Sequence, residues 1–245
     1  MLHAFVTVAL LAAMTMAEDS TAQNRYTPQR ERMAQEIAAM ARETGVETGR
    51  PVFGEGVMAS LRKVARHRFV PPSQESSAYE NRPLPIGNSQ TISQPYIVAL
   101  MTDLLDPKPG DVVLEVGTGS GYQAAVLAEI VARVYTIEIV PALGRKATET
   151  LTALGYRNVV TRIGDGYNGW AEQAPFDAII VAAAAPEIPQ PLIDQLKPGG
   201  RMVIPLGGRY DVQQLLVIEK KADGAAVSRS TIPVRFVPLT RAGPG

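Results

Sequence analysis

An apolar run that ends in three glycines at alternate positions is the feature that most constrains how this chain folds. The run 112–116 is long enough for one buried strand, and Gly117, Gly119 and Gly121 follow it. Residues 122–131 then have the composition of a helix. Glycines let the backbone turn through positive φ and let a ligand approach the main chain closely. A strand, a glycine turn and a helix N-terminus form the layout of nucleotide sites in open α/β sheets.

The spacing of the glycines separates two classes of nucleotide ligand. The motif is G-x-G-x-G and not the dinucleotide pattern G-x-G-x-x-G. Glu115 stands just before the glycines. This combination indicates S-adenosylmethionine rather than NAD.

Acidic residues follow the next two predicted strands. Glu138 ends one of them, where a carboxylate can accept hydrogen bonds from both ribose hydroxyls of a nucleoside. A solvated strand-end carboxylate is the alternative. Asp165 and Gly166 follow the other strand, where Asp165 could bond an adenine amino group, although Asp-Gly is also a common turn. The predicted cofactor-binding residues are Glu115, Gly117, Thr118, Gly119, Gly121, Glu138, Asp165 and Gly166.

The amino-acid composition argues against several other classes of function. The chain of 245 residues contains no cysteine, which excludes disulfides, thiol nucleophiles and thiolate zinc sites. Its histidines are His3 and His67, so a Ser-His-Asp hydrolase would depend on His67 alone. Lys plus Arg and Asp plus Glu both number 24, which gives no electrostatic case for nucleic acid binding.

Residues 1–24 resemble a leader segment. Residues 1–17 are apolar apart from three positions, but this stretch is too short to span a bilayer comfortably and no Lys or Arg precedes it. Cleavage after Ala17 or Ala22 would give a periplasmic protein; a disordered leader or a misassigned start codon is the alternative. S-adenosylmethionine is made in the cytoplasm, and on that chemical ground we expect a cytoplasmic protein with no stable membrane association.

The remaining residues, 25–245, are expected to form a single domain. Its first part, 25–105, is predicted to be a helical cap that also carries the segment for the methyl acceptor. We expect helices in it at 28–44, 57–66 and 94–105, a loop at 45–56 and an irregular segment at 79–93. From residue 106 onward, strands alternate with helices, which predicts a doubly wound, mostly parallel, seven-stranded Rossmann-like α/β sheet. The expected strands are 112–116, 133–138, 159–163, 178–182, 201–205, 213–219 and 234–239. Helices are expected at 122–131, 141–154 and 189–196, with turns at 197–200 and 223–224.

Several motifs together resemble the protein-L-isoaspartate (D-aspartate) O-methyltransferases. They cover roughly residues 33–239, and only the first two dozen residues fall outside the resemblance. The segment 45–56 is looser than is usual in the family, and Asn88-Ser89 replaces a glycine and a polar residue. The matching segments are 66–70, 78–80, 83–95, 115–122, 164–166, 175–181, 193–200 and 235–239.

The resemblance implies methyl transfer from S-adenosylmethionine to the free carboxylate of an isoaspartyl residue in a damaged protein or peptide, which starts repair through a succinimide. Ser93 is similar to the active-site serine of the family, and its implied role is a hydrogen bond to the acceptor carboxylate. Capping of the helix that follows is the alternative. An ionised carboxylate needs no general base, which agrees with the scarcity of histidine. The implied substrate-binding residues are Thr91, Ile92, Ser93 and Val237, and no metal is expected.

Other functions stay open at this point. The same fold could methylate a small molecule or RNA, or the chain could be a catalytically silent nucleoside-binding module. His67 is expected to be structural rather than catalytic, and Trp170 is expected to pack rather than to line an adenine pocket. We expect a monomer whose partners are isoaspartyl proteins and peptides and not nucleic acids.

Overall fold

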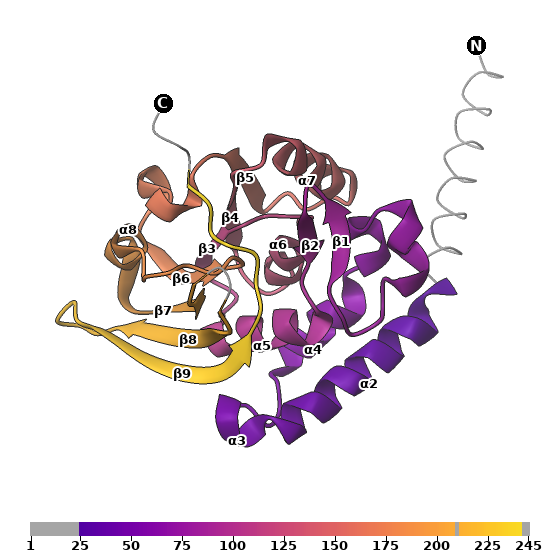
Figure 1. Cartoon of the computed structure of the whole chain (residues 1–245), viewed down its shortest axis with the longest axis horizontal. Helices are drawn as coiled ribbons and strands as arrows, with labels where there is room; N and C mark the ends of the chain where they lie inside the picture. The colour runs from indigo at the N-terminus through magenta and orange to yellow at the C-terminus, as the bar shows by residue number, and fades with distance from the viewer. Residues whose placement is uncertain (1–24, 209–210, 242–245) are drawn as a thin grey trace, which may run out of the picture.

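The computed structural model describes residues 25–208 and 211–241, and over these residues the chain forms a seven-stranded sheet (Figure 1). The strand order is β5-β4-β3-β6-β7-β8-β9. The first five strands of this order pair in parallel, and β8 and β9 add antiparallel pairs. The predicted fold class is therefore confirmed. The strands are β3 (Val112–Val116), β4 (Arg133–Glu138), β5 (Val159–Ile163), β6 (Phe176–Val181), β7 (Leu196–Leu206), β8 (Gln213–Lys220) and β9 (Ala226–Val234).

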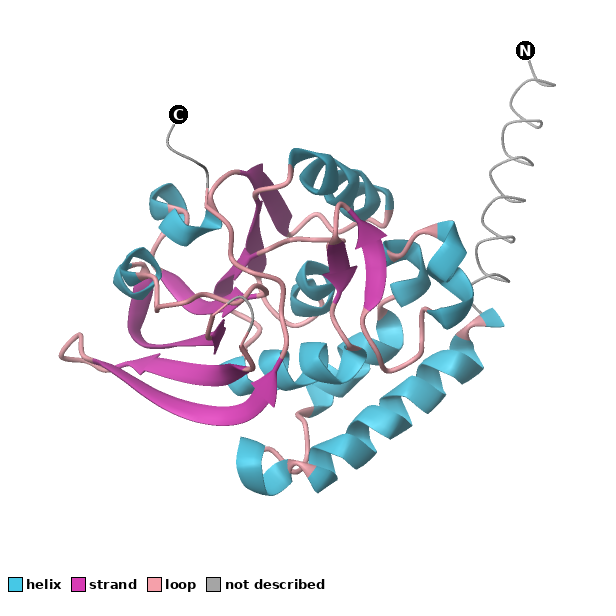
Figure 2. Ribbon diagram, viewed as in Figure 1, coloured by secondary structure: helices cyan, strands magenta, loops and turns pink. Residues whose placement is uncertain are grey.

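Both faces of the sheet are covered, because successive residues of a strand point to opposite sides. Val113 belongs to one buried cluster and its neighbour Leu114 to the other. The first cluster includes the helices α5 (Pro95–Leu105), α6 (Tyr122–Ala128) and α7 (Pro141–Ala153), and the second includes α8 (Gln190–Asp194). Figure 2 shows these helices around the strands. Burial on both faces explains why the central strands β3 and β6 consist almost entirely of apolar residues.

Among the described residues, three α-helices precede α5, and Figure 1 shows α2 and α3 below it. They are α2 (Thr27–Glu43), α3 (Gly45–Thr48) and α4 (Glu55–Lys63), and α2 contacts both α4 and α5. The prediction of a loop over 45–56 was wrong in its first residues, which form α3. The predicted helix 57–66 begins and ends earlier than expected, because Val64 is extended and Arg66 starts a separate 3-10 turn. The predicted leader, 1–24, lies outside the described residues.

A β-hairpin occupies the segment 79–93, which was predicted to be irregular. Its strands β1 (Leu84–Gly87) and β2 (Gln90–Ile92) pair antiparallel. Asn88 and Ser89 connect them with φ of 51° and 57°. A two-residue turn with positive φ at both positions matches the right-handed twist of the strands, and asparagine tolerates this conformation well. The departure at Asn88-Ser89 therefore has a structural role.

Two predicted boundaries near the C-terminus were wrong. Residues 197–200 belong to β7 as an irregularity in its pairing with β6, where Phe176 pairs with Leu196 but Ala178 pairs with Arg201. The last strand is 226–234 and not 234–239; its exposed, polar residues lack the apolar alternation that indicates a strand. Residues 235–239 leave the sheet because the Phe236 amide donates to the Gln213 side chain instead of to β8.

Candidate active site

The strand order reverses between β3 and β6, and a cavity lies at the carboxyl ends of these strands. The chain leaves β3 toward β4 on one side and returns to β6 on the other, which opens a crevice of the kind that binds ligands in α/β sheets. The cavity encloses about 800 Å³, its open mouth included. Among the predicted site residues, its wall contains Thr91, Ile92, Ser93, Glu115, Gly117, Thr118, Gly119, Glu138, Gly166 and Val237.

The glycine turn after β3 forms one wall of this cavity. Gly117 and Gly119 have φ of 94° and 54°, backbone angles that residues with a Cβ rarely adopt. The amides of Gly117 and Thr118 donate to the Ile137 carbonyl at 2.9 and 3.2 Å, so the turn is attached to β4. The backbone at this point is held open toward the cavity without a side chain in the way.

Glu138 ends β4 and holds the glycine turn. One carboxylate oxygen accepts from the Gly119 amide at 2.7 Å and the other from the Val140 amide at 2.9 Å. The residue is only 6% exposed, yet it lines the cavity. A carboxylate can accept about four hydrogen bonds, so two acceptor positions stay available for a ligand.

Glu115 lies deeper in the same wall and is fully buried. One of its oxygens accepts from the Thr136 hydroxyl at 2.5 Å, and the Thr136 hydroxyl also lies 2.6 Å from that of Thr118. The other oxygen, Oε1, is buried without a hydrogen-bond partner among the described residues. Burial is the main cause that raises the pKa of this carboxyl to about 8, and the nearby Glu138 raises it further. Such an orphaned acceptor in a cavity wall suits a donor group or a cation of a ligand.

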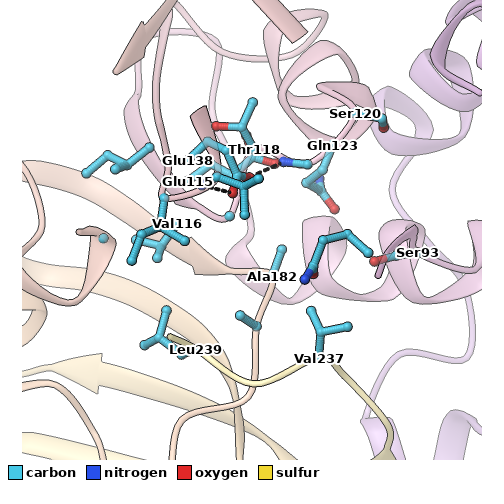
Figure 3. Close-up of a pocket in the computed structure, with 18 of the residues that line it drawn as sticks. Ser93, Glu115, Val116, Thr118, Ser120, Gln123, Glu138, Ala182, Val237 and Leu239 are labelled. Atoms are coloured by element: carbon cyan, nitrogen blue, oxygen red, sulfur yellow. Dashed lines mark hydrogen bonds between the residues drawn. The ribbon is translucent and has the colours of Figure 1, made fainter. Parts of the chain in front are cut away.

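Ser93 stands where the first cavity meets a second one. The second cavity, of about 920 Å³, is walled by residues just before β1, on β2, on α5 and in the segment 233–237, and it shares Thr91, Ser93, Ala182 and Val237 with the first. Figure 3 shows Glu115, Thr118 and Glu138 grouped on one side, with Ser93 on the other and Ala182 between them in this view. Gln94, not Ser93, is the N-cap of α5, and no side chain caps that helix. The described residues therefore leave the Ser93 hydroxyl without a capping bond.

The segment after β9 completes the wall between the two cavities. The Ala184 amide donates to the Val237 carbonyl at 2.8 Å, and the Leu239 amide donates to the Ala184 carbonyl at 2.7 Å. These bonds attach the C-terminal segment to the loop that follows β6. Val237 thereby lines both cavities, as Ala182 does.

Two predicted cofactor residues do not line the cavity. Gly121 starts α6 and faces α7 instead: a Cβ added there would lie 3.1 Å from Leu151 Cδ1. Asp165 directs one oxygen to the Tyr167 amide at 3.0 Å and the other to Arg241 Nε at 3.7 Å. Its neighbour Gly166 does line the cavity, so the contact of Asp165 with a ligand stays a prediction.

His67 and Trp170 lie in packed aromatic groups. The His67 ring stacks on Tyr26 with 4.1 Å between centroids, and its Nδ1 is 2.8 Å from the Tyr79 hydroxyl. Trp170 contacts Tyr135 edge to face at 5.3 Å between centroids, and it is not part of the cavity wall. Neither ring faces the site.

The wall also contains residues that the sequence analysis did not single out, Gln123 and Ala182 among them. Gln123 points into the cavity from α6, with its amide nitrogen donating to the Thr102 hydroxyl at 2.9 Å. Ala182 follows β6 directly and lies between the two cavities. The signal for Ala182 was present, because residues just past the carboxyl end of the strand across the switch point reach the same crevice. Gln123 carried no comparable signal.

The family model of protein-L-isoaspartate(D-aspartate) O-methyltransferase matches residues 41–243. This chain belongs to that family. Protein-L-isoaspartate O-methyltransferase 1 of Cupriavidus necator is 56% identical over 97% of this chain and 90% of the relative. Protein-L-isoaspartate O-methyltransferase 2 of a Polaromonas species is 62% identical over 85% of this chain and 99% of the relative. The resemblance inferred from the motifs is confirmed.

Solved structures agree with the family assignment. A protein-L-isoaspartate O-methyltransferase superposes with a TM-score of 0.72 at 26% identity, covering 86% of this chain and 66% of the other. A Plasmodium falciparum protein described as a beta-aspartate methyltransferase, in complex with S-adenosyl-L-homocysteine, gives 0.70 at 26% identity, covering 84% and 98%. Membership in the family makes this chain an enzyme that uses S-adenosyl-L-methionine as methyl donor.

Replacement of Gly121 tests whether this glycine is needed for packing. Gly121→Ala should destabilise the protein by about 1–2 kcal/mol for the left-handed φ of 88°, and by about 1–3 kcal/mol more for contact with Leu151. Gly155→Ala is the matched control, since Gly155 has φ of 81° but nothing within 4 Å of an added Cβ. Urea unfolding of both variants measures the difference. Equal losses would contradict the packing role.

The raised pKa of Glu115 predicts a pH-dependent stability. The native carboxyl keeps its proton up to about pH 8, whereas the unfolded one loses it near its ordinary value of 4.5. The stabilisation is therefore complete below pH 4.5 and is lost as the pH rises through about 8, by up to about 1.4 kcal/mol per pH unit. Glu115→Gln should remove this slope in urea unfolding between pH 5 and 8 without ligand. Parallel pH profiles for the two proteins would show that Glu115 is ionised when buried.

Proposed function

We propose that the two joined cavities carry out the reaction of the family in this chain: methyl transfer from S-adenosyl-L-methionine to the free carboxylate of an L-isoaspartyl or D-aspartyl residue. The observation that carries the proposal is their junction at Ser93, Thr91, Ala182 and Val237. A donor in the first cavity and an acceptor in the second would meet there. Methyl transfer needs this contact, because the two reacting atoms must come into line.

The wall of the first cavity fits the donor. Glu138 has acceptor positions left for ribose hydroxyls, and the glycine turn admits close approach of a ligand to the backbone. The orphaned Oε1 of Glu115 suits the ammonium or another donor group of the methionine part. When bound, S-adenosyl-L-methionine supplies a methyl group on a positively charged sulfur. The residues of the chain bind and orient it.

The junction fits an ionised acceptor. A carboxylate with an ordinary pKa is already an anion at neutral pH, so the site needs no general base. The Ser93 hydroxyl is available to donate a hydrogen bond to that anion, since it caps no helix. Val237 and Ala182 give the rest of the junction an apolar wall, which excludes water from the reacting atoms.

The second cavity suits a peptide chain that carries the acceptor. Pro83, Ile97 and Phe236 give it apolar sides, and the exposed Arg235 stands on its wall. An isoaspartyl residue places its free carboxylate on a short branch while the main chain continues through the side-chain carbon. A peptide lying in this cavity could thus extend the branch toward Ser93. We propose damaged proteins and peptides, and not nucleic acids, as its occupants.

We also propose that residues 25–245 act as one domain and as a monomer in the cytoplasm. Met33 and Ile37 of α2 share a single buried cluster with Val113 and Ala178 of the sheet, which supports one domain. In the described ranges 25–208 and 211–241, no helix is long and apolar enough to cross a bilayer. Supply of the methyl donor inside the cell supports the cytoplasm.

Ser93→Ala tests the acceptor role. Loss of one orienting hydrogen bond should lower kcat for an isoaspartyl peptide on the order of 10²-fold, with the affinity for S-adenosyl-L-homocysteine nearly unchanged. Steady-state kinetics and calorimetry measure the two quantities. Ser76→Ala, at an exposed position outside both cavities, is the matched control. Wild-type turnover in Ser93→Ala would remove the assignment.

Glu138→Ala tests the donor site. The variant loses a charged acceptor for the ribose and frees the Gly119 amide, so the affinity for S-adenosyl-L-homocysteine should fall by about 1–3 kcal/mol. Glu172→Ala, which removes an exposed carboxylate paired with Arg162, should leave that affinity unchanged. Calorimetric titration compares them. Equal dissociation constants would make Glu138 a support of the turn only.

A further inference from the structure

A fully buried arginine packs against the segment 79–93, which contains the β1–β2 hairpin and ends at Ser93. This segment is called the acceptor segment below. Arg66 is 0% exposed and belongs to the 3-10 turn Arg66–Phe69. Its Nε donates to the Ala78 carbonyl at 2.8 Å, and one of its terminal nitrogens donates to the Ser93 carbonyl at 2.9 Å. Its guanidinium carbon lies 4.7 Å from the centre of the Tyr122 ring. Arg66 itself does not line either cavity.

The charge of Arg66 has no anionic partner in the part of the chain that the structure describes. Burial lowers the pKa of the guanidinium to about 10, which still leaves it charged at neutral pH. The two carbonyls and the Tyr122 ring face are what offset the loss of water. A buried cation without a carboxylate is costly, so its retention calls for a role in the arrangement of its neighbours.

The three groups that Arg66 contacts belong to different parts of the site. Ala78 precedes the β1–β2 hairpin and Ser93 follows it, so the two hydrogen bonds close the hairpin at its base. Tyr122 is the first residue of α6, directly after the glycine turn. One guanidinium thus joins both ends of the acceptor segment to the helix that follows the donor site.

We propose that Arg66 is a positioning residue for methyl transfer, which holds Ser93 and the β1–β2 hairpin in register with the donor site through the Ser93 carbonyl. This inference rests on the acceptor role proposed for Ser93. Arg66 touches no substrate; it acts by fixing the backbone from which the Ser93 hydroxyl projects. A displacement of about 1 Å there would take the acceptor out of line with the methyl group.

The geometry requires arginine and not another cation. A guanidinium is planar, donates to two carbonyls in fixed directions and packs its face on an aromatic ring. A lysine ammonium on its flexible stem could reach one carbonyl but could not hold both and cover Tyr122. Arg66→Lys therefore keeps a nitrogen donor of similar reach and removes the alignment.

The test is Arg66→Lys in the full chain, compared with Arg30→Lys. Arg30 is a matched control: it is also buried, donates to two carbonyls, those of Arg62 and Lys63, at 2.9 and 3.2 Å, and lies 5.8 Å from the centre of a tyrosine ring, that of Tyr79, but it does not bond the Ser93 carbonyl. We expect Arg66→Lys to lower kcat for an isoaspartyl peptide on the order of 10-fold, with KM and the affinity for S-adenosyl-L-homocysteine changed less than about twofold. Arg30→Lys should keep kcat within about twofold.

A double-mutant cycle with Ser93→Ala separates this inference from the function on which it rests. If Arg66 acts through Ser93, Arg66→Lys should lower kcat by less than about threefold once Ser93 is alanine. Full additivity of the two losses, or equal losses in the lysine variants of Arg66 and Arg30, overturns the positioning role. If Ser93→Ala alone leaves kcat at the wild-type value, that result refutes the acceptor role instead.

Hydrogen exchange gives a readout that does not depend on turnover. Amides of residues 84–92 should exchange faster in Arg66→Lys than in Arg30→Lys, and unchanged protection overturns the proposal. The wild-type protein provides a measurement that needs no variant: the NMR signals of the terminal N–H groups of Arg66, one of which donates to the Ser93 carbonyl, should shift when an isoaspartyl peptide binds with S-adenosyl-L-homocysteine. A signal that does not move overturns the proposal even if Arg66→Lys fails to fold.

Discussion

The turn after β3 is the constraint on which the rest of the site depends. A parallel strand ends there with Gly117 and Gly119 at positive φ, and the carboxylate of Glu138 accepts the Gly119 amide at 2.7 Å. Because Glu138 comes from the neighbouring strand, the turn and the strand ends fix each other. The donor cavity is therefore built from backbone that has little freedom to relax. Preorganisation of this kind suits a reaction whose rate comes from alignment rather than from proton transfer.

Two buried ionisable groups lie on either side of the junction. Glu115 is fully buried on the donor side with one oxygen unpartnered, and Arg66 is fully buried behind Ser93 with no carboxylate beside it. Neither group is explained by stability, since burial of a charge or of an unsatisfied carboxyl costs free energy. We propose that each is explained by what it faces: the cavity assigned to the positively charged donor for Glu115, and the backbone of the acceptor segment for Arg66.

The strands of the parallel core were predictable because the residues that indicate each strand are neighbours in the sequence. The strands 112–116, 133–138 and 159–163 have the expected bounds, since each is rich in β-branched residues and is either followed by a glycine or ends in an acidic residue. The strand 226–234 was not predictable from apolar alternation, because an exposed edge strand has little of it. The wall residues were predictable where they follow a strand. Arg66 was not, because its role depends on Ala78 and Ser93, which only the hairpin brings together.

The most direct test of the account is the selectivity of turnover between an isoaspartyl peptide and its aspartyl isomer. In the isoaspartyl form the carboxylate and the following amide exchange places and the backbone gains a methylene. A junction that holds the carboxylate at Ser93 and the backbone in the second cavity can align only one isomer. We expect kcat/KM to favour the isoaspartyl peptide by at least about 10²-fold. Comparable rates on the two isomers, with S-adenosyl-L-methionine bound tightly, would contradict the account.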